Sequence, residues 1–560
     1  MTAHFPAALF LPKDAYDVSS QQVLGRRVAG AQLARAFAGD LQAGEMLSVV
    51  SPGEGAVEAV SQLLADITPS GAMVRVSGQA TPQLLAEVGA LYVPDPIIGR
   101  WTPLRQALSP TAFSLTGVIH TVCSEGALAG LANLPLAPLY SWDAVICTSR
   151  AGRDVVSKAL EHRLELMARR LGVGLPARDD LRLPQLPIIP LVASAEQPYQ
   201  PGLDRGARRL SARRELQLDA SAFVVAFVGR LSFHSKCHPI SLYRALEQLA
   251  VEHPDREIVL VECGHIFNQW IAAAYDELRV QFPHLRFRLV GGLEPATDEQ
   301  KWTVLAAADV FTSPADNLQE TFGLALLEGM ASELPLVVTD WNGYRDLVCD
   351  GENGFLVPTR DLLGDLNGAD DIDVEFALGS LDYDAMIGVR SLGVVVDHQA
   401  YLAAFRQLLA QPALRSAMGR ASVARLERCF SSKAVARAYR ELWGSLADLR
   451  AAAAADGPDE STRLLEATPS YSALFDHYAT SGLADIRQRV FTPTPDLIRQ
   501  LTSAMNQWLL ERASAGRLKE LLAHLEAGAS ISFDALLEQG FSAAQALRVL
   551  AVLAKFTPAG

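Results

Sequence analysis

Ser313–Pro335, with the sequence SPADNLQETFGLALLEGMASELP, is the stretch that says most about the fold. A strand-like run, Ala308–Thr312, leads into a polar loop that ends at Glu320. Phe322–Ser332 is rich in Leu, Ala and Met and predicts a short helix, and Leu334–Thr339 predicts a buried strand. A helix between two buried strands is typical of an α/β fold with a parallel sheet.

Two carboxylates in this stretch, Glu320 and Glu328, lie eight positions apart. One belongs to a strand-to-helix turn and the other to the helix, so both can face a ligand that lies across the helix N-terminus. That is where α/β folds bind phosphorylated ligands, because free backbone N–H groups and the helix dipole favour anions. Taken without their surroundings, the two glutamates are better explained as solvated surface charges.

The surroundings resemble the Glu-x7-Glu signature of retaining glycosyltransferases with the GT-B fold, of the family 4 type. The resemblance implies an α/β protein with two Rossmann-like domains that face each other across a cleft. It also implies an enzyme that moves a sugar from a nucleotide-sugar donor to an acceptor. The positions in register are Pro314, Glu320, Phe322, Gly323, Leu327, Glu328, Met330, Ala331, Pro335, Asn342–Val348 and Gly351–Pro358.

The resemblance assigns roles to five residues of this stretch. Glu320 is expected near the donor sugar as a catalytic residue, with its carboxylate accepting hydrogen bonds from sugar hydroxyls. Glu328 is expected to accept hydrogen bonds from the ribose. Thr321, Phe322 and Gly323 are expected to offer backbone N–H groups to the diphosphate, and the glycine lets the chain approach it closely.

Gly229–Lys236 follows a predicted strand and resembles the element in which the family neutralises the donor diphosphate with an Arg and a Lys. Arg230 and Lys236 are the matching cations. Negative charge builds on the leaving diphosphate as the glycosidic bond breaks, and fixed cations stabilise it. Cys237 stands where the family usually has a glycine. The alternative is a pair of surface cations near a strand end.

Two candidates come from the first part of the chain. Gly25–Gly30 resembles the glycine-rich loop with which the family's first domain meets the diphosphate, which makes Gly25 a donor-binding candidate, although both glycines are equally well explained by packing at a helix start. His120 follows an apolar run at a predicted strand end. Relatives often place a histidine there against the donor sugar, whereas a lone histidine in such a place is as often a core residue.

No metal or other cofactor is predicted. Asp371–Asp373 and Asp382–Asp384 are Asp-x-Asp triplets, but neither ends a hydrophobic strand, and both are interpreted as loop carboxylates. The six cysteines are scattered and form no Cys-x2-Cys pair, so a zinc site is not expected and a reduced, cytosolic protein is.

Composition and charge limit the classes of protein to which the chain can belong. The chain has 560 residues, 49% of them apolar and 20% charged, which is typical of a globular protein of about three domains. The net charge of −14 argues against general nucleic-acid binding. The N-terminus does not resemble a signal peptide, and no apolar run reaches the roughly 20 residues that span a bilayer. We expect a cytoplasmic location, with peripheral contact at the inner membrane face left open.

Alternation of strands and helices predicts an N-terminal Rossmann-like domain on the acceptor side over residues 1–205. A second, nucleotide-sugar-binding domain with crossover helices is predicted over 206–450, and an all-helical domain without an assigned role over 463–560. In that last region Leu497, Leu501, Met505 and Leu509 are predicted to share a helix face. The expected strands are 7–11, 46–50, 72–76, 117–121, 144–148, 223–228, 257–261, 286–290, 309–312 and 335–339.

The resulting prediction is a glycosyltransferase acting with retention of configuration in polysaccharide, glycolipid or glycoconjugate synthesis. The sequence leaves open a carbohydrate, lipid-linked or protein acceptor, and self-association or partner binding through 463–560. One alternative is a phosphorylase or a sucrose-synthase-like enzyme on the same fold. Another is a catalytically idle GT-B scaffold that binds a partner through its C-terminal helices.

Overall fold

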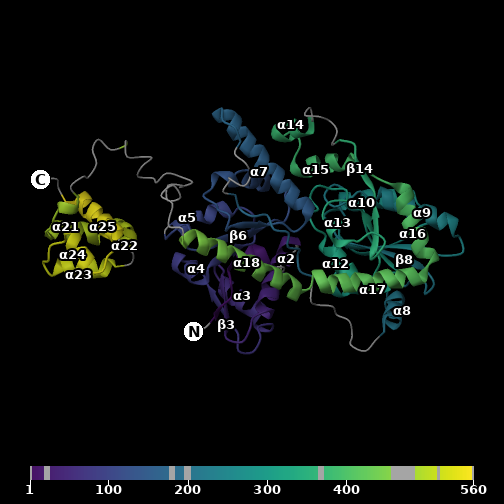
Figure 1. Cartoon of the computed structure of the whole chain (residues 1–560), viewed down its shortest axis with the longest axis horizontal. Helices are drawn as coiled ribbons and strands as arrows, with labels where there is room; N and C mark the ends of the chain where they lie inside the picture. The colour runs from purple at the N-terminus through teal and green to yellow at the C-terminus, as the bar shows by residue number, and fades with distance from the viewer. Residues whose placement is uncertain are drawn as a thin grey trace. The chain divides into compact units, whose positions relative to one another are not determined.

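The computed structural model describes residues 3–17, 25–106, 108–175, 183–193, 204–363, 371–455, 478, 486–513 and 517–557. The chain forms two compact units, Met1–Ala467 and Thr468–Gly560. The first unit contains two parallel sheets with helices packed against them, and the second is helical (Figure 1).

The first sheet has seven strands among the described residues. β3 pairs with β4 along one edge and with β1 and then β2 along the other, and the sheet continues through β5, β6 and β7, all in parallel pairs. The strands are β1 (Ala3–His4), β2 (Ala8–Phe10), β3 (Glu45–Val50), β4 (Met73–Ser77), β5 (Ala90–Val93), β6 (Ser114–Val118) and β7 (Ala144–Ile146).

The second sheet has six parallel strands in the order β10-β9-β8-β11-β12-β13. In both sheets the strand that comes first in the chain is central, and the later strands extend first to one side and then to the other, which is the Rossmann order. This confirms the predicted pair of Rossmann-like halves. The strands are β8 (Phe223–Val228), β9 (Ile258–His265), β10 (Arg286–Gly292), β11 (Val310–Ser313), β12 (Leu336–Thr339) and β13 (Gly354–Val357).

Helices cover both sheets, as βαβ connections require. The first half has α1 (Lys13–Tyr16), α2 (Gly25–Gly39), α3 (Ala56–Ala65), α4 (Pro82–Val88), α5 (Thr102–Gln106), α6 (Glu125–Ala132) and α7 (Arg150–Leu171), with short 3-10 turns at Ile98–Trp101 and Leu134–Leu136. The second has α8 (Arg205–Glu215), α9 (Ile240–Glu252), α10 (Gln269–Arg279), α11 (Asp298–Ala307), α12 (Leu324–Ala331), α13 (Tyr344–Leu347), α16 (His398–Ala410) and α17 (Pro412–Cys429).

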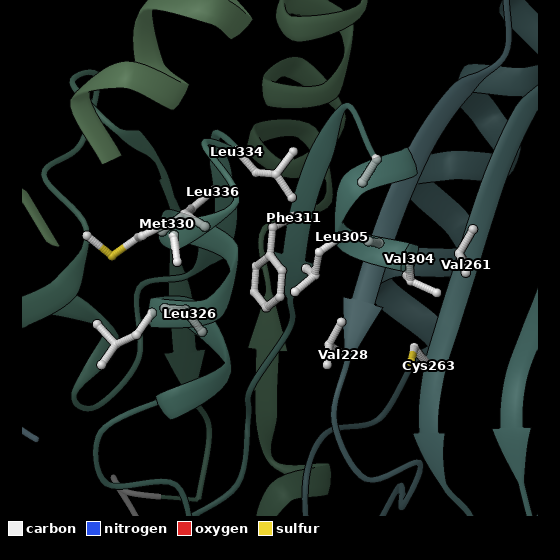
Figure 2. Close-up of a cluster of buried hydrophobic side chains, with 14 of the residues drawn as sticks. Val228, Val261, Cys263, Val304, Leu305, Phe311, Leu326, Met330, Leu334 and Leu336 are labelled. Carbon is white, nitrogen blue, oxygen red and sulfur yellow. The ribbon is translucent and has the colours of Figure 1, made fainter. Parts of the chain in front are cut away.

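One side of the second sheet packs against α12 through the core cluster of Figure 2. The ring of Phe311, on β11, lies among side chains of α11 and α12. A Cβ on Gly329 would lie 2.8 Å from that ring, so the glycine lets α12 approach β11 closely. This contact fixes the helix that carries Glu328.

α18 (Ser432–Ala455) follows the last helices of the second half and packs against α2 and β6 of the first (Figure 1). Trp443 and Tyr439 form aromatic contacts with Phe37, with ring centroids 5.3 and 5.1 Å apart. Arg440 donates hydrogen bonds to Asp40 at 2.6 Å and to Glu45 at 2.7 Å. These contacts tie the two halves together, and Glu45 places one of them at the amino end of β3.

A helical excursion projects from the second half between the paired strands β14 (Thr359–Asp361) and β15 (Val394–Val396). It contains α14 (Asp371–Ala377) and α15 (Tyr383–Leu392). The interpretation of the two Asp-x-Asp triplets as loop carboxylates is therefore wrong. Asp371 and Asp373 belong to α14, while Asp382 caps α15, where its side chain accepts a hydrogen bond from the N–H of Ala385.

The second unit has its own apolar core, to which Leu497, Leu501, Leu521 and Leu525 contribute. The predicted stripe of Leu497, Leu501, Met505 and Leu509 is wrong, because the helix ends at Thr502 and Met505 is 83% exposed; the side chain of Leu509 lies outside the part that the structure describes. Ser503 has an extended backbone, which redirects the next helix. The helices are α21 (Pro495–Thr502), α22 (Ala504–Ala513), α23 (Leu518–Glu526), α24 (Phe533–Glu538) and α25 (Ala543–Phe556), with a 3-10 turn at Ile486–Gln488.

Among the helices that the structure describes, none is long and apolar enough to cross a membrane.

Candidate active site

The charged candidates of the second half gather where the strand order of its sheet reverses. β8 and β11 are neighbours, and the chain leaves them toward opposite sides of the sheet. Gly229–Lys236 follows β8, and the loop that ends at Glu320 follows β11. The carboxyl ends of such a pair of strands diverge and leave a crevice in which open α/β sheets bind ligands.

Lys236 and Glu320 form an ion pair at this crevice, with the side chains 16% and 11% exposed. Burial alone would raise the pKa of Glu320, but Lys236 and the backbone N–H groups of Phe322 and Thr321 bring that pKa below its ordinary value. Glu320 is therefore ionised at neutral pH.

Arg230 lies beside the same pair. Its guanidinium donates a hydrogen bond to Gln319 Oε1 at 3.0 Å and lies 5.8 Å from the centroid of the Phe267 ring. Burial lowers the pKa of Arg230, while Glu320 acts in the opposite direction, and the group stays charged at neutral pH. The structure thus brings both predicted cations to one carboxylate.

Glu328 is held by a second cation that the sequence did not single out. Lys301, on α11, donates to Glu328 Oε1 at 2.7 Å and to Asp298 at 2.9 Å. Burial raises the pKa of Glu328 above its ordinary value, and the two carboxylates raise the pKa of Lys301. Glu328 and Glu320 therefore belong to two separate ion pairs, one at each end of the segment that joins them.

The backbone between the two glutamates turns sharply at Gly323. This residue has φ +110° and is the N-cap of α12. A Cβ there would lie 2.6 Å from the ring of Tyr344, so the position requires glycine for both conformation and space. Phe322 donates its N–H to Glu320 at 3.4 Å, and its side chain belongs to the core. Thr321 is also buried, and its carbonyl oxygen accepts a hydrogen bond from Ser149 of the first half at 2.8 Å.

His120 lies two residues beyond β6, which ends at Val118, earlier than the predicted strand 117–121. Burial lowers the pKa of His120 to about 4, with the nearby Arg26 acting in the same direction and a hydrogen bond to Pro94 against it. The imidazole is therefore neutral at pH 7. Its neighbour Thr121 donates to the carbonyl oxygen of Gln319 at 3.0 Å, so this strand end meets the loop that carries Glu320.

The predicted glycine-rich loop over Gly25–Gly30 is wrong, because these residues form the first turns of α2. Gly30 is a packing glycine: a Cβ there would lie 2.1 Å from the carbonyl oxygen of Ala15. Gly25 is the first residue of the helix, with no atom within 4 Å of the position of a Cβ. Arg26 follows it and reaches Asp14 at 3.1 Å.

Sequence reasoning missed several residues that complete the site. The Tyr344 hydroxyl lies 2.7 Å from the Ser313 hydroxyl and donates to Glu320 at 3.4 Å, and Asn342 donates to the carbonyl oxygen of Glu320. Both belong to the run Asn342–Val348, which is in register with the family signature, and that match was the signal by which they could have been found. Lys301 had none, because its role depends on which helices are neighbours in space.

Within the described residues, no group of three or more His, Cys, Asp or Glu side chains is placed to hold a metal ion. The carboxylates of the site are instead engaged by cations and by backbone N–H groups.

Comparisons with known proteins agree with this geometry. Residues 222–368 match the family described as Glycosyl transferases group 1. A D-inositol 3-phosphate glycosyltransferase of Corynebacterium kroppenstedtii is 33% identical over 168 residues, which are 29% of this chain and 35% of the relative. A phosphatidyl-myo-inositol mannosyltransferase of Mycolicibacterium smegmatis is 35% identical over 144 residues, 25% and 33% of the two chains. The chain thus spans about a third of the length of the curated relatives it matches.

Among solved structures, HepE of Anabaena in complex with UDP has a TM-score of 0.47 and 17% identity, over 78% of this chain and all of the other. Sucrose-phosphate synthase of Thermosynechococcus elongatus has a TM-score of 0.47 and 18% identity, over 79% and 100%. The matched segment 222–368 contains Arg230, Lys236, Glu320 and Glu328. The similarity to the glycosyl transferases group 1 lies in that segment.

Proposed function

We propose that the protein is a retaining glycosyltransferase that moves a sugar from a nucleotide-sugar donor to an acceptor hydroxyl. The observation that carries this proposal is the cluster of Arg230, Lys236 and Glu320 at the switch point between β8 and β11. Two fixed cations beside a buried carboxylate suit a reaction in which a diphosphate leaves and a sugar is held by its hydroxyls.

In this proposal Lys236 and Arg230 stabilise the charge that develops on the leaving diphosphate. Glu320 then accepts hydrogen bonds from the donor sugar, and Glu328 accepts them from the ribose. The acceptor attacks from the side of the leaving group, and a β-phosphate oxygen takes its proton, so neither glutamate forms a covalent bond. His120 is neutral at pH 7 and serves as a hydrogen-bonding group toward the sugar.

The curated relatives support the transfer chemistry, because their names describe glycosyl transfer and the family match covers the segment that holds the charged cluster. The names of the relatives specify inositol-containing acceptors. The first half of this chain lies outside the family match.

A donor screen tests the proposal. Purified protein is incubated with uridine, guanosine and adenosine diphosphate sugars, and thermal shift and nucleoside diphosphate release are measured. We expect one donor class to stabilise the protein and to be hydrolysed slowly, and Glu320→Gln to abolish the hydrolysis. Glu277→Gln, an exposed carboxylate on α10, is the matched control. Absence of binding and turnover with every donor, together with no effect of Glu320→Gln, would favour the idle scaffold.

A further inference from the structure

A cavity of 440 Å³ lies beside the charged cluster, within the first unit. It is bounded by α6 and the residues before it, by the loop after β11 together with Trp341, and by the excursion between β14 and β15. Its lining includes Glu125, Leu128, Asp316, Leu318, Phe376 and Met386.

Much of this wall lies outside the segment that matches the family. The match ends at residue 368, before α14 and α15, and it begins at residue 222, after α6. Phe376 and Met386 on one side and Leu128 on the other are therefore features of this chain that the family match does not cover. A site with these walls is expected to select a ligand different from those of other proteins of the family.

A row of hydrogen bonds joins the cavity to the donor residues. Cys123, which lines the cavity, lies 3.1 Å from the Tyr383 hydroxyl, measured from its sulfur. Gln319 donates to the same hydroxyl at 3.3 Å and accepts from Arg230 at 3.0 Å. Tyr383 and Gln319 thus stand between the cavity and Arg230, at the side of the donor site that faces the first half.

The lining of the cavity is mainly apolar, with carboxyl groups set into it. Leu128 and Leu318 are 38% and 37% exposed, although both are large apolar side chains. Asp316 is 4% exposed, and its carboxyl accepts hydrogen bonds only from backbone N–H groups among the described residues, that of His238 at 3.1 Å. Burial raises the pKa of Asp316 to about 8, so the group is mostly protonated at pH 7.

The charged groups around the cavity are mostly negative. Glu125 is exposed at the start of α6, and Asp361 lies at the end of β14. Asp373 pairs with Arg390 at 3.1 Å. Carboxyl groups accept hydrogen bonds from hydroxyls, whereas a phosphate there would meet like charges.

We propose that this cavity is the acceptor subsite and that it takes an amphiphile whose head carries hydroxyl groups and no phosphate. The apolar wall built by α6 and α14–α15 holds the apolar part, and Glu125 and Asp316 bind the hydroxyls. The acceptor hydroxyl then points from the cavity toward the donor sugar, past Tyr383 and Gln319. This inference rests on the proposed function and differs from it in naming the acceptor chemistry.

Binding of two simple probes tests the chemistry of the cavity. Octyl β-D-glucoside, kept below its critical micelle concentration, and octyl phosphate are titrated into the full chain by calorimetry. We expect saturable binding of octyl glucoside and at least tenfold weaker binding of octyl phosphate. Equal or tighter binding of octyl phosphate would overturn the inference.

Two pairs of variants locate the binding. Phe376→Ala is expected to weaken octyl glucoside binding at least tenfold, whereas Val374→Ala, on the same helix and 56% exposed, leaves it unchanged. Glu125→Gln is expected to reduce the ratio between the affinities for octyl glucoside and octyl phosphate. Glu58→Gln, which changes an exposed carboxylate on α3, is its control. Thermal unfolding confirms that each variant folds. Unchanged affinity in a folded Phe376→Ala variant would place the probe elsewhere and refute the inference.

A transfer assay separates this inference from the proposed function. With a donor found in the screen, wild-type protein is expected to form glycosylated octyl glucoside, detected by mass spectrometry. Phe376→Ala is expected to raise the KM for octyl glucoside at least tenfold and to leave the KM for the donor unchanged. Donor hydrolysis without transfer to octyl glucoside would refute the acceptor subsite and leave the proposed function standing, whereas absence of donor binding would refute the latter.

Discussion

The two sheets of the first unit share one strand order, but the residues that follow their strands differ in charge. After β8 and β11 the chain places Arg230, Lys236 and Glu320, which are charged and partly buried. The corresponding positions of the first half hold Gly25 at the start of a helix and His120, which burial keeps neutral.

The difference shows that the strand order sets where a crevice forms, while the residues at the strand ends set its charge. The crevice position follows from the strand order, which both halves share. The charge follows from the residues at the strand ends, and among the site candidates only those of the second half form a cluster of charged side chains. We therefore expect substitutions in the second half to change donor chemistry and substitutions in the first to change stability or the acceptor.

The largest effect is expected from Lys236→Ala. It removes a cation from the leaving diphosphate, and loss of one such group lowers turnover by about 10²–10³-fold. The measurement is the rate of nucleoside diphosphate release with the donor found in the screen. Lys433→Ala, an exposed lysine on α18, is the matched control. Equal rates for the two variants would contradict the assignment of the charged half to the donor.

Gly30→Ala tests whether the glycines of the first half serve packing. The added Cβ would lie 2.1 Å from the backbone oxygen of Ala15, which cannot rotate away. Overpacking of this kind costs about 1–3 kcal/mol, and chemical denaturation measures it. Gly444→Ala on α18, with no atom within 4 Å of the new Cβ, is expected to be stabilising by about 0.5–1 kcal/mol. Unchanged stability with lost donor binding in Gly30→Ala would instead restore the phosphate-loop interpretation.

Glu328→Gln probes the second ion pair of the charged half. The amide cannot accept from Lys301 and two ribose hydroxyls as a carboxylate does, so donor affinity is expected to fall about tenfold, or about 1.4 kcal/mol. We expect a raised KM for the donor with little change in kcat, because the ribose takes no part in bond breaking. A fall in kcat at unchanged KM would assign Glu328 to the reaction instead.

The smallest effect at pH 7 is expected from His120→Gln, through its pH dependence. The pKa of His120 is about 4 in the folded protein and about 6.5 when unfolded, so the unfolded chain binds an extra proton between those values. Wild-type protein therefore loses stability as the pH falls from about 6.5 to 4, and His120→Gln loses less. Denaturation at several pH values measures the difference, and parallel curves would contradict the lowered pKa of His120.

Local pattern was a good guide to the fold. Continuous apolar runs such as Phe223–Val228 became buried parallel strands, since a strand covered on both faces has no polar side to show. The pattern failed where one local sequence fits two different structures. The spacing that starts at Leu497 fits one long helix, but the helix ends just before Ser503. The run Gly25–Gly30 resembles a loop, but it forms the first turns of α2.

The two Rossmann-like halves and the identity of the charged residues could be read from the sequence, because strand periodicity and motif spacing are local properties of the chain. Which charges meet depends on tertiary packing. Lys236 pairs with Glu320 across 84 positions, and Lys301 pairs with Glu328 because α11 packs beside α12. Tertiary packing also decided that α14, α15 and α6 enclose a cavity beside these pairs, since a cavity is a property of surfaces brought together by packing rather than of any one segment.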